Sequence, residues 1–366
     1  MTTEKVTAYI SQIKALDESA MEKAKERLDS LVKPPGSLGV LEDIAMRLSG
    51  ISGEMYYDPG KRCVIIMCSD NGVVEEGVAA APQAVTHMQT LNFTRGLTGV
   101  TAIAKQFNTD LIIVDVGVNA DIDHPLIINR KIRKSTSNIA AGHAMTYEEA
   151  EQAILTGIEM AESAVKQGCN LLGAGEMGIG NTTTSAAILC ALTGLSPESV
   201  TGKGAGLKDE AYRRKVEVIR EAIENNKPDA KDPIDVLAKV GGFDLAAMAG
   251  VFIGAAYMKK PVVIDGFISI VAALAACRMN PLVKQYMFAS HESQEPGYVH
   301  AMKALGLEPS LKLNMRLGEG SGCPIMFGVI DAACAIMRDM GTFEQANIGE
   351  EYINEVKDAD FTVKKG

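Results

Sequence analysis

From residue 62 onward, short apolar runs alternate with longer segments of helical periodicity, and this alternation constrains the fold more than any other feature of the sequence. Candidate strands are residues 63–68, 111–114, 170–172, 261–264, 286–288 and 311–315. The spacing predicts helices near 84–106, 147–167, 182–193, 208–225, 243–257, 267–278, 295–305 and 323–340. Strands that alternate with helices form a parallel sheet covered by helices. We therefore expect an α/β fold with a Rossmann-like, doubly wound parallel sheet.

The two ends of the chain differ from this pattern. Residues 4–30 have helical periodicity with a break near Asp17, and the segment Lys-Pro-Pro-Gly-Ser at 33–37 cannot continue a helix. The tail from Phe343 is polar and charged, and residues 342–366 are expected to add one more short helix. We therefore expect a small helical domain formed by residues 1–58 and 341–366, with the Rossmann-like domain at 59–340.

Composition excludes several classes of protein. A formal charge of −10 is a poor match for nucleic acid or an anionic membrane, so a phosphate ligand must be held by local groups. No run of 18 apolar residues and no signal segment occurs, which predicts a cytoplasmic protein. The seven cysteines have no CxxC spacing and the five histidines form no ligand pair, so neither disulfides nor a metal site is expected.

The segment 173–184, GAGEMGIGNTTT, places glycines between a predicted strand and a predicted helix. Asn181 and Thr182 can cap that helix, which would leave its first amides and its positive dipole end free for a phosphate or carboxylate. The segment is neither GxGxxG nor a GxxxxGK[ST] loop, because no lysine follows the glycines. The alternative is that the glycines only make a tight turn.

The second informative segment is RLGEGSG at 316–322, which precedes the last predicted helix. Glycines on both sides leave Glu319 few bulky neighbours, so its carboxylate can point into a cleft and act as a general base. The alternative is that Glu319 caps the helix 323–340.

Three further segments lie near predicted strand ends. Residues 70–78 form a polar and glycine-rich loop, and residues 201–206 together with Lys215 offer flexible backbone and ammonium groups suited to a phosphate. His291 has no serine nucleophile in a suitable context. Ser293 is expected to cap the helix that follows it.

Taken together, these segments resemble the nicotinate-nucleotide:dimethylbenzimidazole phosphoribosyltransferases of cobamide assembly. The resemblance is spread over almost the whole chain. It rests on KPPGSLG at 33–39 with 41–42, DNGV at 70–73, 83–93, 117–118, GEMGIGNTT at 175–183, GGFD at 241–244, IDGF at 264–267, 290–291 with 295–296, and RLGEG at 316–320.

This resemblance implies transfer of phosphoribose from nicotinate mononucleotide to an aromatic lower-ligand base, with inversion at the anomeric carbon and release of nicotinate. It also implies a pentosyltransferase without cofactor or metal, built from a Rossmann-like domain and a small helical domain formed by both termini. The expected assembly is a homodimer or a heterodimer with a paralogous subunit.

The resemblance also assigns roles to residues. Glu319 matches the catalytic glutamate that takes the acceptor's proton, and Glu176 matches a second carboxylate at the cleft. The residues that would surround the nucleotide phosphate and ribose are Gly178, Gly180, Asn181, Thr182, Gly204, Lys215 and Ser293. Leu317 and Gly318 would face the ligands through their backbone.

Two departures from the family pattern concern the acceptor. Ala79 and Met88 stand where family members usually have serine and glutamine. Loss of both polar partners would favour an apolar ring. The family has a branch of paired subunits that attach phenol or p-cresol, and we hypothesise a phenolic acceptor of that kind.

Three alternatives remain open. The chain could be an ordinary benzimidazole enzyme that tolerates Ala79 and Met88. It could be a catalytically silent partner subunit of a heterodimeric enzyme, although the presence of both Glu319 and Glu176 counts against this. A nicotinamide-dependent dehydrogenase is disfavoured because GxGxxG does not follow the first predicted strand.

Overall fold

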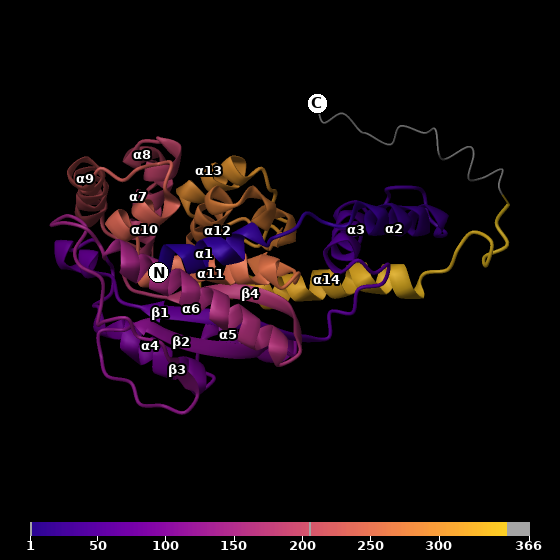
Figure 1. The fold of residues 1–366 in the computed structure, drawn as a ribbon, viewed down its shortest axis with the longest axis horizontal. Coiled ribbons are helices and arrows are strands. Elements are labelled where there is room, and N and C mark those ends of the chain that lie inside the picture. The colour runs from indigo at the N-terminus through magenta and orange to yellow at the C-terminus, as the bar shows by residue number, and fades with distance from the viewer. Residues whose placement is uncertain (1, 205, 350–366) are drawn as a thin grey trace. The chain divides into compact units, whose positions relative to one another are not determined.

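The computed structural model describes residues 2–204 and 206–349. Its centre is a parallel sheet with the strand order β3-β2-β1-β4-β5-β6 (Figure 1). The strands are β1 (Lys61–Ser69), β2 (Asp110–Gly117), β3 (Ile127–Asn129), β4 (Cys169–Met177), β5 (Val262–Ile264) and β6 (Met287–Ala289). Because the order reverses between β1 and β4, right-handed crossovers run in opposite directions and place helices on both faces. The predicted doubly wound α/β fold is confirmed.

Most predicted elements of this region are present. The helices that accompany the sheet are α4 (Ala84–Thr94), α5 (Gly99–Gln106), α6 (Tyr147–Lys166), α7 (Asn181–Thr193), α8 (Pro197–Val200), α9 (Asp209–Asn226), α10 (Pro233–Val240), α11 (Phe243–Tyr257), α12 (Phe267–Met279), α13 (Pro296–Leu305) and α14 (Gly322–Asp339). Two 3₁₀ helices, η1 (Gly72–Glu76) and η2 (Pro281–Tyr286), complete the set. Figure 1 shows α6 and α11 lying together against the sheet.

One strand prediction was wrong, and one strand was not predicted. The segment 311–315 is not a strand, and only Leu311 pairs with the sheet region, through a single bridge to His291. Strand β3 was not predicted, because it has three residues and only Ile127 among them is buried. A strand so short carries no periodicity that a sequence pattern can detect.

Strand β4 is longer than the sequence suggested, and two of its glycines have a packing role. A Cβ on Gly173 would lie 2.7 Å from the Cβ of Cys323, and one on Gly175 would lie 2.7 Å from the carbonyl oxygen of Glu319. The start of α14 and the loop before it therefore pack directly on the backbone of β4. Glycine in a strand commonly marks such a close approach.

A single predicted helix at 84–106 is two helices, α4 and α5. Gly96 has φ +72°, and Thr98 caps α5 by accepting a hydrogen bond from the amide of Thr101 at 3.3 Å. The break creates a second helix start at Gly99, beside the loop that carries Glu319.

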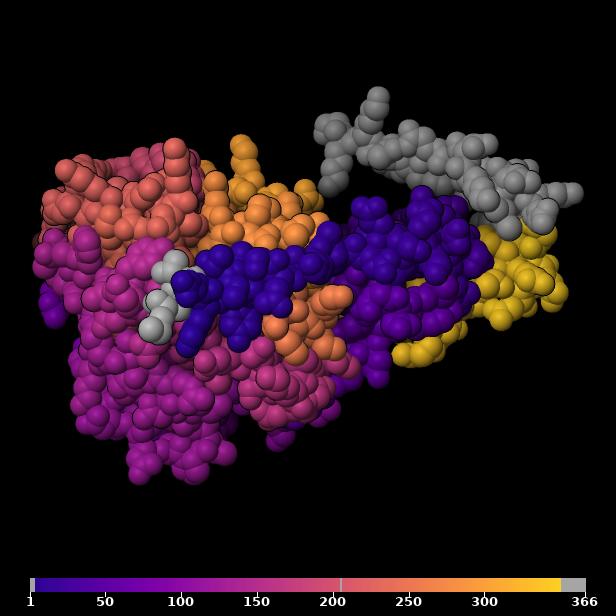
Figure 2. Space-filling model, viewed as in Figure 1, coloured from indigo at the N-terminus to yellow at the C-terminus, as the bar shows by residue number. Residues whose placement is uncertain are grey.

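The contacts divide the chain into two compact units, Met1–Ala15 with Gly60–Phe327 and Leu16–Pro59 with Gly328–Gly366. The first helix, α1 (Thr2–Ser11), therefore groups with the larger unit rather than with the other N-terminal residues. It packs on α6 and α11 and is seen in indigo on the surface of that unit (Figure 2). The physical reason is its apolar side, where Val6 is buried.

The smaller unit contains α2 (Glu18–Ser30) and α3 (Val40–Ser52). Leu31 pairs with Thr342 in an antiparallel bridge, and Arg27 donates to the carbonyl oxygen of Met340 at 2.8 Å. A short helix was expected in the tail at 342–366. The described part of that tail, residues 342–349, forms turns, and residues 350–366 lie outside the described residues.

Candidate active site

A cavity of about 250 Å³ opens beyond the carboxyl ends of β4, β5 and β6, next to the point where the strand order reverses. Ligands bind at this position in doubly wound sheets. The predicted site residues that line the cavity are Ala79, Glu176, Gly178, Gly180, Asn181, Thr182, Gly204, Ser293, Leu317, Gly318 and Glu319. Residues from widely separated segments of the chain are thus brought to one wall.

The turn between β4 and α7 has no space for side chains. A Cβ on Gly178 would lie 2.4 Å from the carbonyl oxygen of Ser69, and Gly180 has φ +93°. The expected cap was wrong: Gly180 is the N-cap of α7, and no side chain caps this helix. Asn181 instead donates from its Nδ2 to Glu176 at 2.5 Å and to Asp244 at 3.0 Å. The amides of Asn181 and Thr183 donate to the carbonyls of Gly178 and Gly180, and the first residues of α7, Asn181 and Thr182, line the cavity.

The loop that carries Glu319 is held in an unusual conformation. Gly318, Glu319 and Gly320 have φ values of +87°, +64° and +80°, and such a conformation is costly for a glutamate. Two buried carboxylates fix it: Glu176 accepts from the amide of Glu319 at 3.1 Å, and Asp265 accepts from the amide of Gly320 at 3.1 Å. Asp265 also accepts from the amide of Gly322 at 2.6 Å.

The side chain of Glu319 is buried and both of its oxygens accept hydrogen bonds. The amide nitrogen of Gln89 donates to Oε1 at 2.8 Å, and the backbone amide of Val100 donates to Oε2 at 3.1 Å. Glu319 therefore does not cap the helix that follows it, as one alternative held. It binds the start of α5, a helix that begins 220 residues earlier in the sequence.

Burial dominates the electrostatics of the cavity floor. Desolvation raises the pKa of Glu176 to about 8, of Asp265 to about 7 and of Asp244 to about 6. Within the described residues, no lysine or arginine forms an ion pair with these three carboxylates, and the ring that approaches them is His291, with Nδ1 3.9 Å from Asp265. The carboxyl groups of Glu176 and Asp265, which line the cavity, thus have no cation beside them in the described chain, and a cationic group bound there would favour their ionised forms.

The opposite end of the cavity carries a buried ammonium group. Nζ of Lys215 donates to the hydroxyl of Thr182 at 2.9 Å and to the carbonyl of Gly202 at 3.1 Å. Burial lowers the pKa of Lys215 to about 8. Lys215 lies behind the wall formed by Thr182 and Gly204 rather than in the wall itself. The carboxyl group of Glu295 also lines the cavity and interacts with this ammonium and with the backbone amide of Gly204, so the positive charge of Lys215 is partly offset.

Two other predictions concerned single side chains. Ser293 lines the cavity but does not cap α13, whose N-cap is Glu295 without a side-chain hydrogen bond. Met88 lies outside the cavity with 51% of its surface exposed, so it cannot make the cavity apolar. The residues of α4 that line the cavity are Val85 and the neighbour of Met88, Gln89.

The sequence analysis missed the roles of Gln89, Asp265 and Asp244. Gln89 could have been found from the period of α4, because adjacent positions of a helix point about 100° apart and only one of 88 and 89 can face inward. For Asp265, the signal was a carboxylate directly after a short buried strand.

Across residues 2–204 and 206–349, no three His, Cys, Asp or Glu side chains are arranged to hold a metal ion, and no helix there is long and apolar enough to span a bilayer.

Comparisons with known proteins agree with this geometry. A family model described as phosphoribosyltransferase matches residues 13–348. The nicotinate-nucleotide–dimethylbenzimidazole phosphoribosyltransferase of Clostridium perfringens is 57% identical over 346 residues, which are 94% of this chain and 96% of that protein. The enzyme of the same name from Acetivibrio thermocellus is 53% identical, over 94% and 97% of the two chains. The crystal structure of the Thermus thermophilus enzyme of that name matches with a TM-score of 0.87 at 41% identity, over 91% and 99% of the chains.

Proposed function

This chain belongs to the phosphoribosyltransferase family, and on that premise we propose that it transfers phosphoribose from nicotinate mononucleotide to an aromatic base that serves as a cobamide lower ligand. The products are the α-ribotide of the base and nicotinate. The observation that carries the proposal is the position of Glu319, which lines the same cavity as the glycine turn at 178–180 and the start of α7.

The charges of the cavity match this donor. Nicotinate mononucleotide has a phosphate at one end and a positively charged pyridinium at the other. The start of α7, with Lys215 behind it, suits the phosphate. Glu176 and Asp265 suit the pyridinium and the positive charge that develops on the ribose when the glycosidic bond lengthens.

The proposed reaction is a displacement at the anomeric carbon. A nitrogen of the acceptor forms the new bond with its lone pair, and the bond to the pyridinium nitrogen breaks with its electron pair passing to that ring, which leaves as nicotinate. The N–H proton of the acceptor passes to the carboxylate of Glu319. Attack opposite the leaving group inverts β to α. Glu176 holds the amide of Glu319 and keeps the loop in place.

For the acceptor, the geometry favours a benzimidazole over a phenol. The phenolic hypothesis depended on two missing polar groups, at Ala79 and Met88. Met88 faces away from the cavity, and the carboxamide of Gln89 supplies a polar group there. Only Ala79 still supports a phenol, since it lines the cavity. We propose dimethylbenzimidazole as the preferred acceptor and p-cresol as the second candidate.

An acceptor competition tests this proposal. The purified chain is incubated with nicotinate mononucleotide and equimolar dimethylbenzimidazole and p-cresol, and the ribotides are separated by chromatography. We expect the benzimidazole product to exceed the cresol product by about 10-fold or more, the discrimination that one polar contact typically provides. Excess cresol product would establish the phenolic alternative. Absence of nicotinate release with every acceptor would favour a silent partner subunit.

We further propose that the chain works in the cytoplasm as a dimer, either with a second copy or with a paralogous subunit. The cysteines support the cytoplasmic location, since all seven are free thiols and six of them are buried. Light scattering of the purified chain tests the second: a mass near twice 38.9 kDa is expected for a homodimer, and a monomer would point to a different partner.

A further inference from the structure

One face of helix α4 presents three hydrogen-bonding side chains in a row that ends on Glu319. Gln89 and Asn92 of α4, and Arg95 directly after its last residue, are spaced three residues apart, so neighbouring members of the row contact each other. Arg95 donates from Nη1 to Oδ1 of Asn92 at 3.3 Å, and Asn92 donates from Nδ2 to Oε1 of Gln89 at 3.1 Å. Gln89 in turn donates to Glu319 at 2.8 Å.

The row gives each carboxamide a fixed direction. A glutamine side chain can present either its oxygen or its NH₂ group toward a neighbour. Because Asn92 occupies the oxygen of Gln89, the NH₂ group points at Glu319. The oxygen of Asn92 is occupied by Arg95 in the same way, so every donor of the row faces the carboxylate.

The second oxygen of Glu319 is fixed from another helix. The amide of Val100, in the first turn of α5, donates to it. Two donors from two separate helices therefore define the plane of the carboxylate. The two donors are needed because Glu319 lies between two glycines and has φ +64°. The local backbone by itself therefore does little to limit the direction of the Glu319 side chain.

We propose that Gln89 is a positioning residue that sets the orientation of the Glu319 carboxylate toward the acceptor, and that Asn92 acts only through Gln89. The inference rests on the proposed function in one respect, that Glu319 accepts the acceptor's proton. A general base must lie within hydrogen-bond distance of the proton that it removes, so a rotated carboxylate lowers turnover without weakening donor binding.

The test compares Q89M, N92L, the double variant Q89M/N92L and the matched control Q167M. Gln167 is an exposed glutamine at the end of α6, away from the cavity. Nicotinate release is measured with dimethylbenzimidazole as acceptor, as kcat and as KM for nicotinate mononucleotide.

For Q89M we expect kcat to fall about 10-fold with KM unchanged, because the carboxylate is no longer held toward the acceptor. N92L should lower kcat about 3-fold, and the double variant should match Q89M alone, since residues that act in series are not additive. Native kcat in Q89M would overturn the proposal. So would a double variant whose loss is the product of the two single losses, because Asn92 would then act independently.

A second readout does not need turnover. The side-chain amide resonances of Gln89 should differ between the native protein and E319Q, because a carboxylate accepts a stronger hydrogen bond from this amide than a carboxamide does. If the native chain releases no nicotinate, the proposed function fails and this comparison alone decides the inference. Identical Gln89 resonances in the native protein and in E319Q would overturn it.

Discussion

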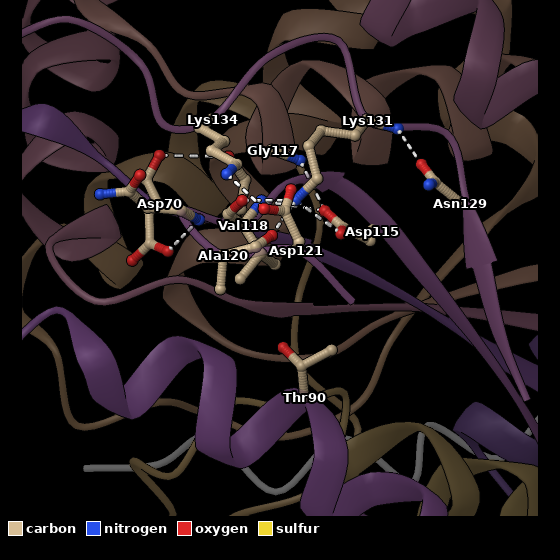
Figure 3. Close-up of polar contacts among 12 residues, drawn as sticks. Asp70, Thr90, Asp115, Gly117, Val118, Ala120, Asp121, Asn129, Lys131 and Lys134 are labelled. Atoms are coloured by element: carbon tan, nitrogen blue, oxygen red, sulfur yellow. Dashed lines mark hydrogen bonds and ion pairs between the residues drawn. The ribbon is translucent and has the colours of Figure 1, made fainter. Parts of the chain in front are cut away.

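The carboxyl ends of two neighbouring strand pairs use buried carboxylates in opposite ways. Beyond β1 and β2, Asp115 is buried and pairs with the ammonium of Lys131 at 2.8 Å, while its other oxygen accepts from the amides of Gly117 and Val118 (Figure 3). Lys131 also donates to the carbonyl of Ala120 at 2.7 Å. The charges of Asp115 and Lys131 therefore neutralise each other, whereas burial raises the pKa of Asp70, a second buried carboxyl group at this edge.

Beyond β4 and β5, Glu176 and Asp265 are equally buried but accept hydrogen bonds mainly from neutral amides. Their pKa values are raised because burial penalises their ionised forms. A neutralised cluster stabilises a loop and has no remaining capacity for a ligand. A cluster without a cation can receive one from a substrate, and groups with such shifted pKa values are characteristic of functional sites.

The largest effect should come from breaking the neutralised cluster. Replacing Lys131 with Met leaves Asp115 buried without a cation, which typically costs about 3–5 kcal/mol. We expect a loss of that order in urea unfolding, with normal activity per folded molecule. Lys134→Met is the control, because its pair with Asp121 is exposed and should contribute little to stability. Equal stability of the two variants would contradict the distinction between the two regions.

The next effect concerns the part of the cavity beside the ammonium of Lys215, where the phosphate of the donor is proposed to bind. Replacing Lys215 with Met removes a cation beside the proposed phosphate position, and hydrogen bonds to charged groups contribute about 1.5–3 kcal/mol. The kcat/KM for nicotinate mononucleotide should therefore fall about 10- to 100-fold, mainly through KM. Lys208→Met, at an exposed residue before α9, serves as the control. An unchanged KM in a folded Lys215→Met protein would place the phosphate elsewhere.

A smaller effect should appear in the pH dependence of stability. The pKa of Glu176 is about 8 in the folded protein against an ordinary value of 4.5, so between these pH values the folded state holds a proton that the unfolded state has lost. The free energy of unfolding should therefore fall as pH rises through this window. In Glu176→Gln the free energy of unfolding should fall less across this window, because the variant has no proton to lose at this position. An unchanged slope would mean that Glu176 is ionised throughout.

The sequence was informative where local pattern decides structure. The apolar runs at 63–68 and 261–264 predicted β1 and β5, and the glycines of 316–322 marked the loop of Glu319. It was uninformative where distant segments meet. Gly173 and Gly175 look like turn residues until the start of α14 is seen against them. Asn181 looks like a cap, yet its amide binds two buried carboxylates whose proximity no local pattern reveals.

The contrast between Met88 and Gln89 teaches the same lesson at the scale of one residue. A motif comparison assigned the acceptor contact to position 88, whereas the helix directs position 89 into the cavity. The identity of the residue at a motif position is therefore weaker evidence about acceptor specificity than the direction in which its side chain points.

The most direct test of the central claim is nicotinate release by Glu319→Gln, measured beside the native chain with nicotinate mononucleotide and dimethylbenzimidazole. Glutamine keeps the size of the side chain but cannot accept the acceptor's proton, so turnover should fall at least about 100-fold, the usual contribution of a general base, while the protein stays folded. Turnover equal to that of the native chain would show that Glu319 is not the base and would contradict the proposed mechanism.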